Sequence, residues 1–337
     1  MTKHIENIPL LPGHIGASRS LKVIRYGRAG ARPKAYIQAS LHADEIPPML
    51  VQHHLIRLLD ESDRAGRIRG EVIVVPVANP AGVTQVLHGA LLGRFDLPSG
   101  ANANRNWPDL YDGLPDRVRP LLTQDAQENT ALVRAAMADT LSQIKPNSEM
   151  GSLRLALARL AFDADIVLDL HCDMEAVLHL FMHSALSPAG TDLAAEIGSQ
   201  ATMLAEIAGN GTFEHAFSAP WIKLADELQS SFPLALACFA ATVEYRGSVD
   251  VDDSFARPDA EALFRFLRRR GLIKGEALPL PPLVSAPRSA ACCDTIRSPV
   301  AGIIAYKVSL GDSVSKGQTI AELVDPLGMI LSRHACR

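Results

Sequence analysis

The sequence lacks the features that mark membrane and secreted proteins. Its longest wholly apolar run, residues 234–241, is far shorter than the ~20 residues that a membrane helix needs. The first residues, MTKHIENIPLLPG, have no basic start followed by an apolar stretch and a cleavage site, so no secretory signal is visible. We therefore expect a cytoplasmic protein that does not bind a membrane.

The sequence also has few cysteines and no excess of positive charge. The five cysteines are irregularly spaced and fit neither a disulfide framework nor a CxxC zinc cluster; they are Cys172, Cys238, Cys292, Cys293 and Cys336. The 33 Lys and Arg against 37 Asp and Glu give a formal charge of −4, so no basic field invites nucleic acid or an anionic membrane. The length of 337 residues suggests about two domains.

Strands that alternate with helices run through most of the chain. Residues 71–77 (EVIVVPV) and 165–170 (DIVLDL) have the pattern of strands that are buried on both faces. Further strands are expected at residues 21–28, 34–41, 176–182 and 236–245, and helices at 47–60, 126–144, 149–162, 192–208 and 258–270. This alternation predicts an α/β fold with a mixed, mostly parallel sheet flanked by helices.

The composition changes near residue 277. Residues 1–276 have the size and pattern of a catalytic α/β domain, and residues 277–293 begin with the proline-rich stretch ALPLPPLVSAP, which is typical of an inter-domain linker. Residues 294–337 have short alternating strands punctuated by glycines and no helical pattern. We therefore expect a small all-β domain at the C-terminus.

The most distinctive local motif is His42-Ala43-Asp44-Glu45, directly after the expected strand KAYIQASL. Open α/β sheets form their binding crevice at the carboxyl ends of strands, and imidazole and carboxylate groups are both good zinc ligands. His171 follows DIVLDL at the end of another expected strand. A lone histidine there is more often a satisfied residue at a sheet edge. Together with His42 and Glu45, however, it completes the three protein ligands that a catalytic zinc needs.

Two further features add candidate catalytic groups. Arg94 and the Asn104-Arg105 pair lie in the long irregular region 81–125, and the planar fork of an arginine suits a carboxylate or a developing oxyanion. Glu244 ends the apolar run that precedes it, where a carboxylate needs either a partner or a task. An ion pair with Arg246 is one interpretation. The other is the base that a zinc hydrolase uses to take a proton from water.

The order of these motifs resembles the zinc carboxypeptidase superfamily. The motifs in question are HADE at 42–45, NPAG at 79–82, NRNW at 104–107, His171 and Glu244. Within that superfamily, the small C-terminal β unit and the DLH motif at 169–171 are similar to the succinylglutamate desuccinylase/aspartoacylase family of deacylases. This similarity covers roughly residues 20–337.

The resemblance implies a reaction and a role for each candidate residue. It implies a zinc-dependent hydrolase that cleaves the amide bond of an N-acyl amino acid, or a related small N-acyl amine, by metal-activated water. One Zn²⁺ per subunit would be held by His42, Glu45 and His171. Glu244 would serve as general base and acid, Arg94 would polarise the scissile carbonyl, and Asn104 and Arg105 would bind the substrate.

Two alternatives stay open at this point. The loop NANRNW departs from the DLNR pattern of aspartoacylases and is closer to the peptidase branch, which favours a metallocarboxypeptidase acting on peptide C-termini. A non-catalytic, ligand-binding member of the family is less favoured, because all three predicted ligands and the predicted base are present.

The C-terminal segment carries a resemblance of its own. Residues 298–318 are similar to a biotinyl/lipoyl half-barrel, but Lys307 and Lys316 stand in the wrong sequence contexts for a modified carrier lysine. We therefore expect a structural unit that shapes the cleft rim or forms an oligomer contact, and a homo-oligomer is left open.

Overall fold

The computed structural model describes residues 1–206, 211–228 and 231–335. The chain divides into two compact units, Met1–Arg288 and Ser289–Arg337, and this boundary falls within the stretch 277–293 that the sequence predicts as a linker. Cys336 lies outside the described residues. Among the helices of the described residues, none has both the length and the apolar character that a membrane crossing requires.

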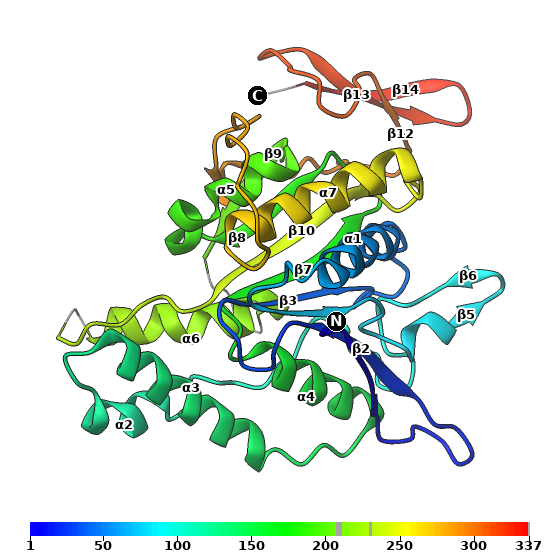
Figure 1. Ribbon diagram of the computed structural model, residues 1–337. Coiled ribbons are helices and arrows are strands. Elements are labelled where there is room, and N and C mark those ends of the chain that lie inside the picture. The colour runs from blue at the N-terminus through cyan, green and yellow to red at the C-terminus, as the bar shows by residue number, and fades with distance from the viewer. Residues whose placement is uncertain (207–210, 229–230, 336–337) are drawn as a thin grey trace. The chain divides into compact units, whose positions relative to one another are not determined.

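The first unit is built around one mixed sheet (Figure 1). From one edge its strands run in the order β1 (His4–Pro9), β2 (Ser20–Tyr26), β4 (Glu71–Val75), β3 (Lys34–Ala39), β7 (Ile166–Asp173), β10 (Phe239–Gly247), β8 (His179–His183) and β9 (Ala201–Ala205). The central pairs β4–β3, β3–β7 and β7–β10 are parallel, as is β8–β9. The pairs β1–β2, β2–β4 and β10–β8 are antiparallel. The predicted α/β fold with a mixed, mostly parallel sheet is confirmed.

Helices cover both faces of this sheet. One core cluster joins it to α1 (Pro47–Arg64), α5 (Ser187–Ile197) and α7 (Asp253–Arg269). The other joins it to α2 (Leu114–Val118), α3 (Ala126–Gln143), α4 (Glu149–Ala161) and α6 (Phe213–Leu228). Every residue of β3 and β4 is buried, which explains why these strands read as continuous apolar or β-branched runs.

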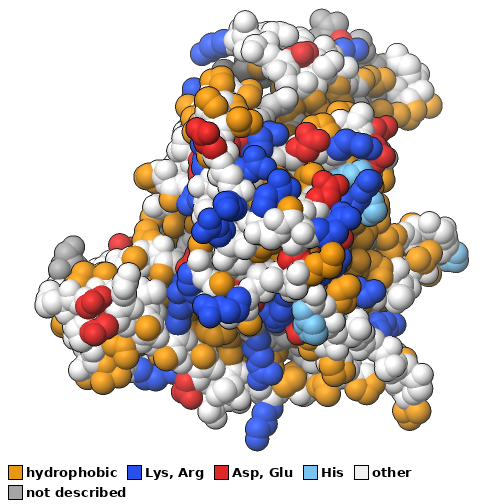
Figure 2. All heavy atoms as spheres, in the orientation of Figure 1, with side chains coloured by type: hydrophobic (Ala, Val, Ile, Leu, Met, Phe, Trp, Pro, Cys, Tyr) orange, Lys and Arg blue, Asp and Glu red, His pale blue; other side chains and the backbone are white. Residues whose placement is uncertain are grey.

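Ion pairs fix α5 against α7. Arg265 and Arg269 of α7 both bind the buried carboxylate of Glu196, at 2.9 and 2.6 Å, and Arg270 binds Asp192 at 2.7 Å. Figure 2 shows Lys and Arg side chains interspersed with Asp and Glu over the face where α1 and α7 lie. The arginines that end α7 are therefore structural partners of α5.

One predicted helix is wrong in its second half. The sequence predicts a helix over residues 192–208, but α5 ends at Ile197, and residues 207 and 208 lie outside the described residues. Gly198 adopts a left-handed conformation, with φ at 66°, which ends a helix readily because glycine has no Cβ. The chain then enters β9, the strand that pairs with β8.

The second unit contains a three-stranded antiparallel sheet, which agrees with the small all-β unit that we expect at the C-terminus. Its strands are β12 (Ile303–Tyr306), β13 (Thr319–Asp325) and β14 (Met329–Ala335). Lys307, one of the two lysines considered above, forms an ion pair with Glu322 at 2.9 Å. The remaining short elements of the chain are the hairpin β5 (Val86–Leu87) and β6 (Ala90–Leu91), the two-residue strand β11 (Arg288–Ser289), and single 3₁₀ turns at Gly82–Thr84, Arg119–Leu121, Ser184–Leu186 and Ala290–Cys292.

Candidate active site

The candidate site lies where three parallel strands end. His42 and Glu45 follow β3 in the turn that leads into α1, His171 lies near the end of β7, and Glu244 lies near the end of β10. The strand register brings these ends together, because Ala39 of β3 pairs with Leu170 and Glu244 pairs with His171. Parallel neighbours thus carry residues that are far apart in sequence to one edge of the sheet.

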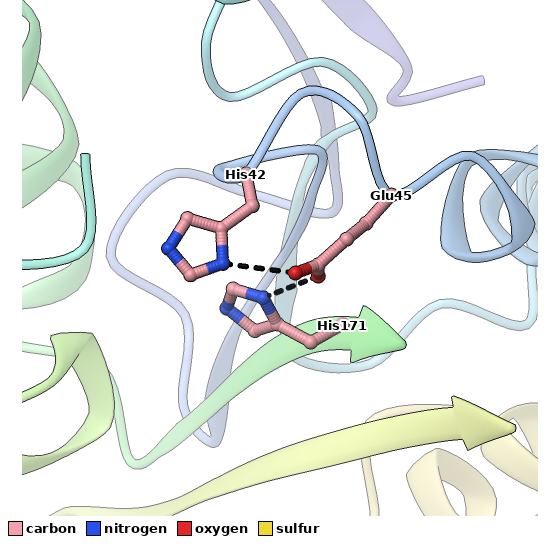
Figure 3. Close-up of side chains that lie close together, drawn as sticks. All are labelled: His42, Glu45 and His171. Carbon is pink, nitrogen blue, oxygen red and sulfur yellow. Dashed lines mark hydrogen bonds and ion pairs between the residues drawn. The ribbon is translucent and has the colours of Figure 1, made fainter. Parts of the chain in front are cut away.

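Glu45 links the two histidines directly (Figure 3). Its Oε1 lies 2.9 Å from Nδ1 of His42, and its Oε2 lies 2.7 Å from Nδ1 of His171. All three side chains are buried, and one ligand atom from each lies within 4.8 Å of the others. The backbone N–H of Cys172 also donates to Oε2 of Glu45, at 3.1 Å, which fixes the carboxylate between the two rings.

The outer nitrogen of each imidazole has its own partner. Nε2 of His171 lies 2.8 Å from Oδ2 of Asp169, and Nε2 of His42 lies 2.9 Å from Oδ1 of Asn102. Asn102 Oδ1 also accepts from the backbone N–H of Asn104 at 2.8 Å, so this atom is an acceptor and His42 carries its proton on Nε2. Once a bound metal has displaced any proton from Nδ1, each ring can offer the lone pair of that atom. Metal-ligating histidines usually have this arrangement, so the residues present fit a divalent metal ion.

The charges around the cluster explain its pKa shifts. Burial alone would raise the pKa of the Glu45 carboxyl, but His171 and His42 hold that pKa well below its usual range. Burial alone would lower the pKa of the His171 imidazole, but Asp169 and Glu45 raise it well above its ordinary value. Buried carboxylates thus favour positive charge at this point, and a metal cation satisfies the same preference.

Glu244 differs from Glu45 and Asp169, because one of its oxygens has no partner among the described residues. Its Oε2 is buried and makes no hydrogen bond to any residue that the structure describes. The pKa of this carboxyl is raised to about 7, chiefly by burial; His171 lowers it, and the nearby charges of Glu45, Asp173 and Asp169 raise it. A carboxyl that titrates near neutral pH is suited to accept and return a proton. Arg246 is bound to Asp259 instead, at 2.7 Å.

The irregular region 81–125 brings three further predicted residues to the same site, namely Arg94, Asn104 and Arg105. Arg94 is about half exposed, and its Nη1 donates to Oε1 of Glu45 at 2.9 Å. Arg105 is exposed, and its Nη1 donates to the carbonyl of Asn104 at 2.6 Å. Asn104 is buried, and its Oδ1 accepts from Trp107 Nε1 at 3.1 Å and from the backbone N–H of Phe213 at 2.8 Å. The amide of Asn104 is therefore used to hold neighbouring segments.

All seven residues named from the sequence line one cavity of about 400 Å³. They are His42, Glu45, Arg94, Asn104, Arg105, His171 and Glu244. The cavity is also lined by Cys172, Asp173, Phe181, Ala205, Glu206, Gly211, Thr212, Glu214, His215 and Thr242. The arrangement thus joins three groups that could hold a metal, one proton acceptor and two guanidinium groups in one space.

Sequence reasoning gave no role to Asp169 or Asn102, the partners of the two imidazoles. Asp169 is fully buried, and its Oδ1 accepts from Gln38 at 2.9 Å. The sequence does indicate that Asp169 lies beside His171, because residues two positions apart on a strand point to the same face of the sheet. No comparable signal exists for Asn102, whose position depends on the conformation of a long loop.

Comparisons with known proteins agree with this fold. The family model described as succinylglutamate desuccinylase/aspartoacylase catalytic domain matches residues 31–142. A curated relative, the N-alpha-acetyl-L-2,4-diaminobutyric acid deacetylase of Halomonas elongata, is 25% identical over 312 residues, which are 88% of this chain and 72% of the relative.

Two solved structures share the fold over nearly the whole chain. A succinylglutamate desuccinylase/aspartoacylase family protein from Shewanella amazonensis has a TM-score of 0.83 and 26% identity, covering 99% of this chain and 92% of its own. A protein of the same description from Shewanella frigidimarina has a TM-score of 0.84 and 23% identity, covering 97% of this chain and 87% of its own.

The mixed sheet and the His-Glu-His cluster at its carboxyl edge are consistent with the zinc carboxypeptidase-like superfamily. Within it, the chain is similar to the succinylglutamate desuccinylase/aspartoacylase family, whose catalytic-domain model matches residues 31–142. Members of this family are deacylases of N-acyl amino acids.

Proposed function

We propose that this protein is a zinc-dependent hydrolase that cleaves the amide bond of an N-acyl amino acid or a closely related small N-acyl amine. The observation that carries the proposal is the cluster of His42, Glu45 and His171, which shares one cavity with Glu244. Two histidines and one carboxylate form a known ligand set of catalytic zinc sites, in which the fourth position stays open. The Halomonas elongata relative, a deacetylase of an N-acetylated amino acid, supports the same reaction type.

In this proposal His42, Glu45 and His171 hold one Zn²⁺ per subunit. Zinc, when bound, would polarise the amide carbonyl and lower the pKa of the attacking water. Asp169 and Asn102 keep the two imidazoles in the tautomer that leaves Nδ1 free, through contacts of 2.8 and 2.9 Å. These contacts also fix the orientation of both rings before a metal arrives.

Glu244 takes the proton of the attacking water and returns it to the departing nitrogen. Its Oε2, which has no partner in the described part of the chain, and its pKa of about 7 support this role, because the carboxyl can hold or release a proton at neutral pH. Arg94 is placed to stabilise negative charge that develops on the carbonyl oxygen, since its guanidinium already lies beside the cluster. Arg105, exposed at the cavity, is the candidate to bind the carboxylate of the substrate.

Cleavage of peptide C-termini is a second candidate function. It is favoured by the loop NANRNW, in which Asn104 and Trp107 hydrogen bond to each other beside the cavity. The cytoplasmic location and a homo-oligomeric state stay predictions from the sequence.

The deciding experiment measures initial hydrolysis rates of the zinc-loaded protein on N-acetyl and N-succinyl amino acids and on dipeptides with a free C-terminus. Turnover of an N-acyl amino acid by the wild type, lost in Glu244→Gln, is the expected result. Turnover of the dipeptides alone would replace the proposal with a carboxypeptidase. No turnover of either group by a protein that binds zinc would contradict both functions.

A further inference from the structure

The loop that carries Arg94 is held by the side chain of Gln85, a residue that no sequence motif singles out. Gln85 directly precedes the hairpin of β5 and β6, which projects from the sheet in Figure 1. Its backbone carbonyl accepts from the N–H of Leu92 at 2.8 Å and so closes the hairpin. Arg94 follows two residues later, so its position depends on how the chain is fixed beyond Leu92.

The amide of Gln85 is bonded to the chain on both sides of Arg94. Its Nε2 donates to the carbonyl of Leu92 at 3.3 Å and to that of Phe95 at 2.8 Å, and its Oε1 accepts from the backbone N–H of Leu97 at 2.7 Å. Both hydrogens of the NH₂ group and the oxygen are therefore used. A reversed amide would turn its oxygen toward two carbonyls and its NH₂ group toward an N–H, so only one orientation fits.

The same loop is also fixed to the turn that carries the metal cluster. The backbone N–H of Ala43 donates to the carbonyl of Gly93 at 3.1 Å, and that of Ala103 donates to the carbonyl of Arg94 at 3.1 Å. A Cβ on Gly93 would lie only 2.5 Å from the Cβ of Ala43, so the close approach requires glycine. The segment around Arg94 is thus held both by the metal-binding turn and by the Gln85 amide.

These backbone contacts matter for Arg94 because its side chain is about half exposed and is not fixed by burial. Its Nη1 donates to Oε1 of Glu45 at 2.9 Å, so the guanidinium reaches the cluster from the loop. Donors that stabilise a developing charge act best when they are in place before the reaction. A displacement of about 1 Å can cost about 10²-fold in rate.

We propose that Gln85 is a positioning residue, which orders the loop so that the guanidinium of Arg94 lies beside the metal cluster before substrate binds. This inference rests on the proposed deacylase function, in which Arg94 stabilises negative charge on the carbonyl oxygen. Gln85 is not among the described residues that line the cavity, so it acts through Arg94 and not on the substrate.

Trypsin measures the order of this loop directly, because it cleaves after arginine. The Arg94–Phe95 bond lies inside the segment that the Gln85 amide holds, and cleavage requires this segment to open. We expect Gln85→Ala to speed cleavage at this bond by about fivefold or more. Cleavage after Arg28, in the exposed turn between β2 and β3, should not change. Equal cleavage after Arg94 in Gln85→Ala and wild type would overturn the inference.

Kinetics test whether this order serves catalysis. On an N-acyl amino acid that the zinc-loaded wild type hydrolyses, Gln85→Ala should lower kcat by about tenfold. Zinc content should not change, because the Gln85 amide binds backbone groups of the loop and not the three proposed ligands. In an Arg94→Ala background the same substitution should lower kcat no further. An additive loss in the double variant, or a loss of zinc, would assign Gln85 to the fold and overturn the inference.

Two further variants serve as controls. Gln85→Glu keeps an acceptor for Leu97 but loses the donors to Leu92 and Phe95, so it should behave as Gln85→Ala does. Wild-type behaviour of Gln85→Glu would contradict the proposal. Gln124→Ala replaces an exposed glutamine that precedes α3, and it should alter neither cleavage after Arg94 nor kcat.

Trypsin cleavage also separates this inference from the proposed function. If no N-acyl amino acid is hydrolysed but Gln85→Ala speeds cleavage after Arg94, the reaction is wrong and the ordering of the loop by Gln85 stands. If Arg94→Ala lowers kcat whereas Gln85→Ala does not, the function stands and the inference is wrong. If Arg94→Ala leaves kcat unchanged, the role of Arg94 and the inference are both overturned.

Discussion

Glu244 on β10 lies at the same register position as His171 on the neighbouring parallel strand β7. Register partners on adjacent strands project to the same side of a sheet, and the strands lie about 4.8 Å apart. The sheet backbone therefore fixes the spacing between the proposed base and the third proposed ligand. A site built in this way depends on strand pairing and not on the conformation of a mobile loop.

Replacing Glu244 with Gln should abolish most catalysis without removing the metal. The amide has the same shape as the carboxylate but cannot accept a proton, so turnover should fall by roughly 10²–10⁴-fold. Zinc content, measured by atomic absorption, should equal that of the wild type. Glu261→Gln, an exposed substitution on α7, is the control. Near-full activity of Glu244→Gln would exclude the residue as the base.

Replacing His171 with Ala, in contrast to Glu244→Gln, should remove the zinc. The substitution deletes one of the three proposed ligands and leaves Oε2 of Glu45 without its imidazole partner. We expect the purified variant to contain far less zinc than the wild type and to gain no thermal stability when zinc is added. His53→Ala, which removes an exposed histidine from α1, is the matched control. Unchanged zinc content in His171→Ala would contradict the ligand assignment.

Asp169→Asn tests the contact that orients His171. Asp169 accepts from both Gln38 and His171, whereas an Asn side chain has only one acceptor oxygen, so one of the two contacts must fail. Zinc affinity should fall by about 10–100-fold, without being abolished. Competition with a chelator measures this change. Asp173→Asn, on the same strand but exposed, should alter zinc affinity far less, and equal losses in the two variants would refute the orienting role.

The sequence predicted the central strands and the meeting of His42, Glu45 and His171 for one physical reason. Both motifs directly follow buried strands, and parallel strands bring their carboxyl ends to the same edge of a sheet. The pairing of Glu244 with His171 could be anticipated only in outline, because strand register is not visible in a single sequence.

The same reasoning could not predict helix α6 or the position of Glu214 in the cavity. Pro220 lies inside α6 and normally signals the end of a helix, so the segment did not read as a helix. The approach of α6 to the metal cluster depends on tertiary contacts, such as the hydrogen bond from the backbone N–H of Phe213 to Asn104. Contacts of this kind leave no periodic signal in the sequence.

The hydrogen bonds of Asp63 should make the stability of the fold depend on pH. Asp63 of α1 accepts hydrogen bonds from the backbone N–H groups of Thr2 and Lys3, at 2.8 to 3.0 Å, and from the hydroxyl of Thr2. Burial alone would raise the pKa of this carboxyl, but these hydrogen bonds lower it below its ordinary value. Asp63→Asn leaves a single acceptor oxygen and turns its NH₂ group toward a backbone N–H, so it should cost about 1–3 kcal/mol at pH 7.

The pH dependence follows from the direction of that shift. A carboxyl with a lowered pKa in the folded protein stabilises the fold above its ordinary pKa of about 3.9, and this stabilisation is lost as the pH falls through the folded-state value. The difference in unfolding free energy between wild type and Asp63→Asn should therefore be constant from pH 7 to pH 5 and shrink below about pH 4. Urea unfolding at several pH values measures it, with the exposed Glu61→Gln on the same helix as control. A difference that stays constant into acid would mean that the charge of Asp63 contributes nothing, because only ionised Asp63 can accept all of these hydrogen bonds.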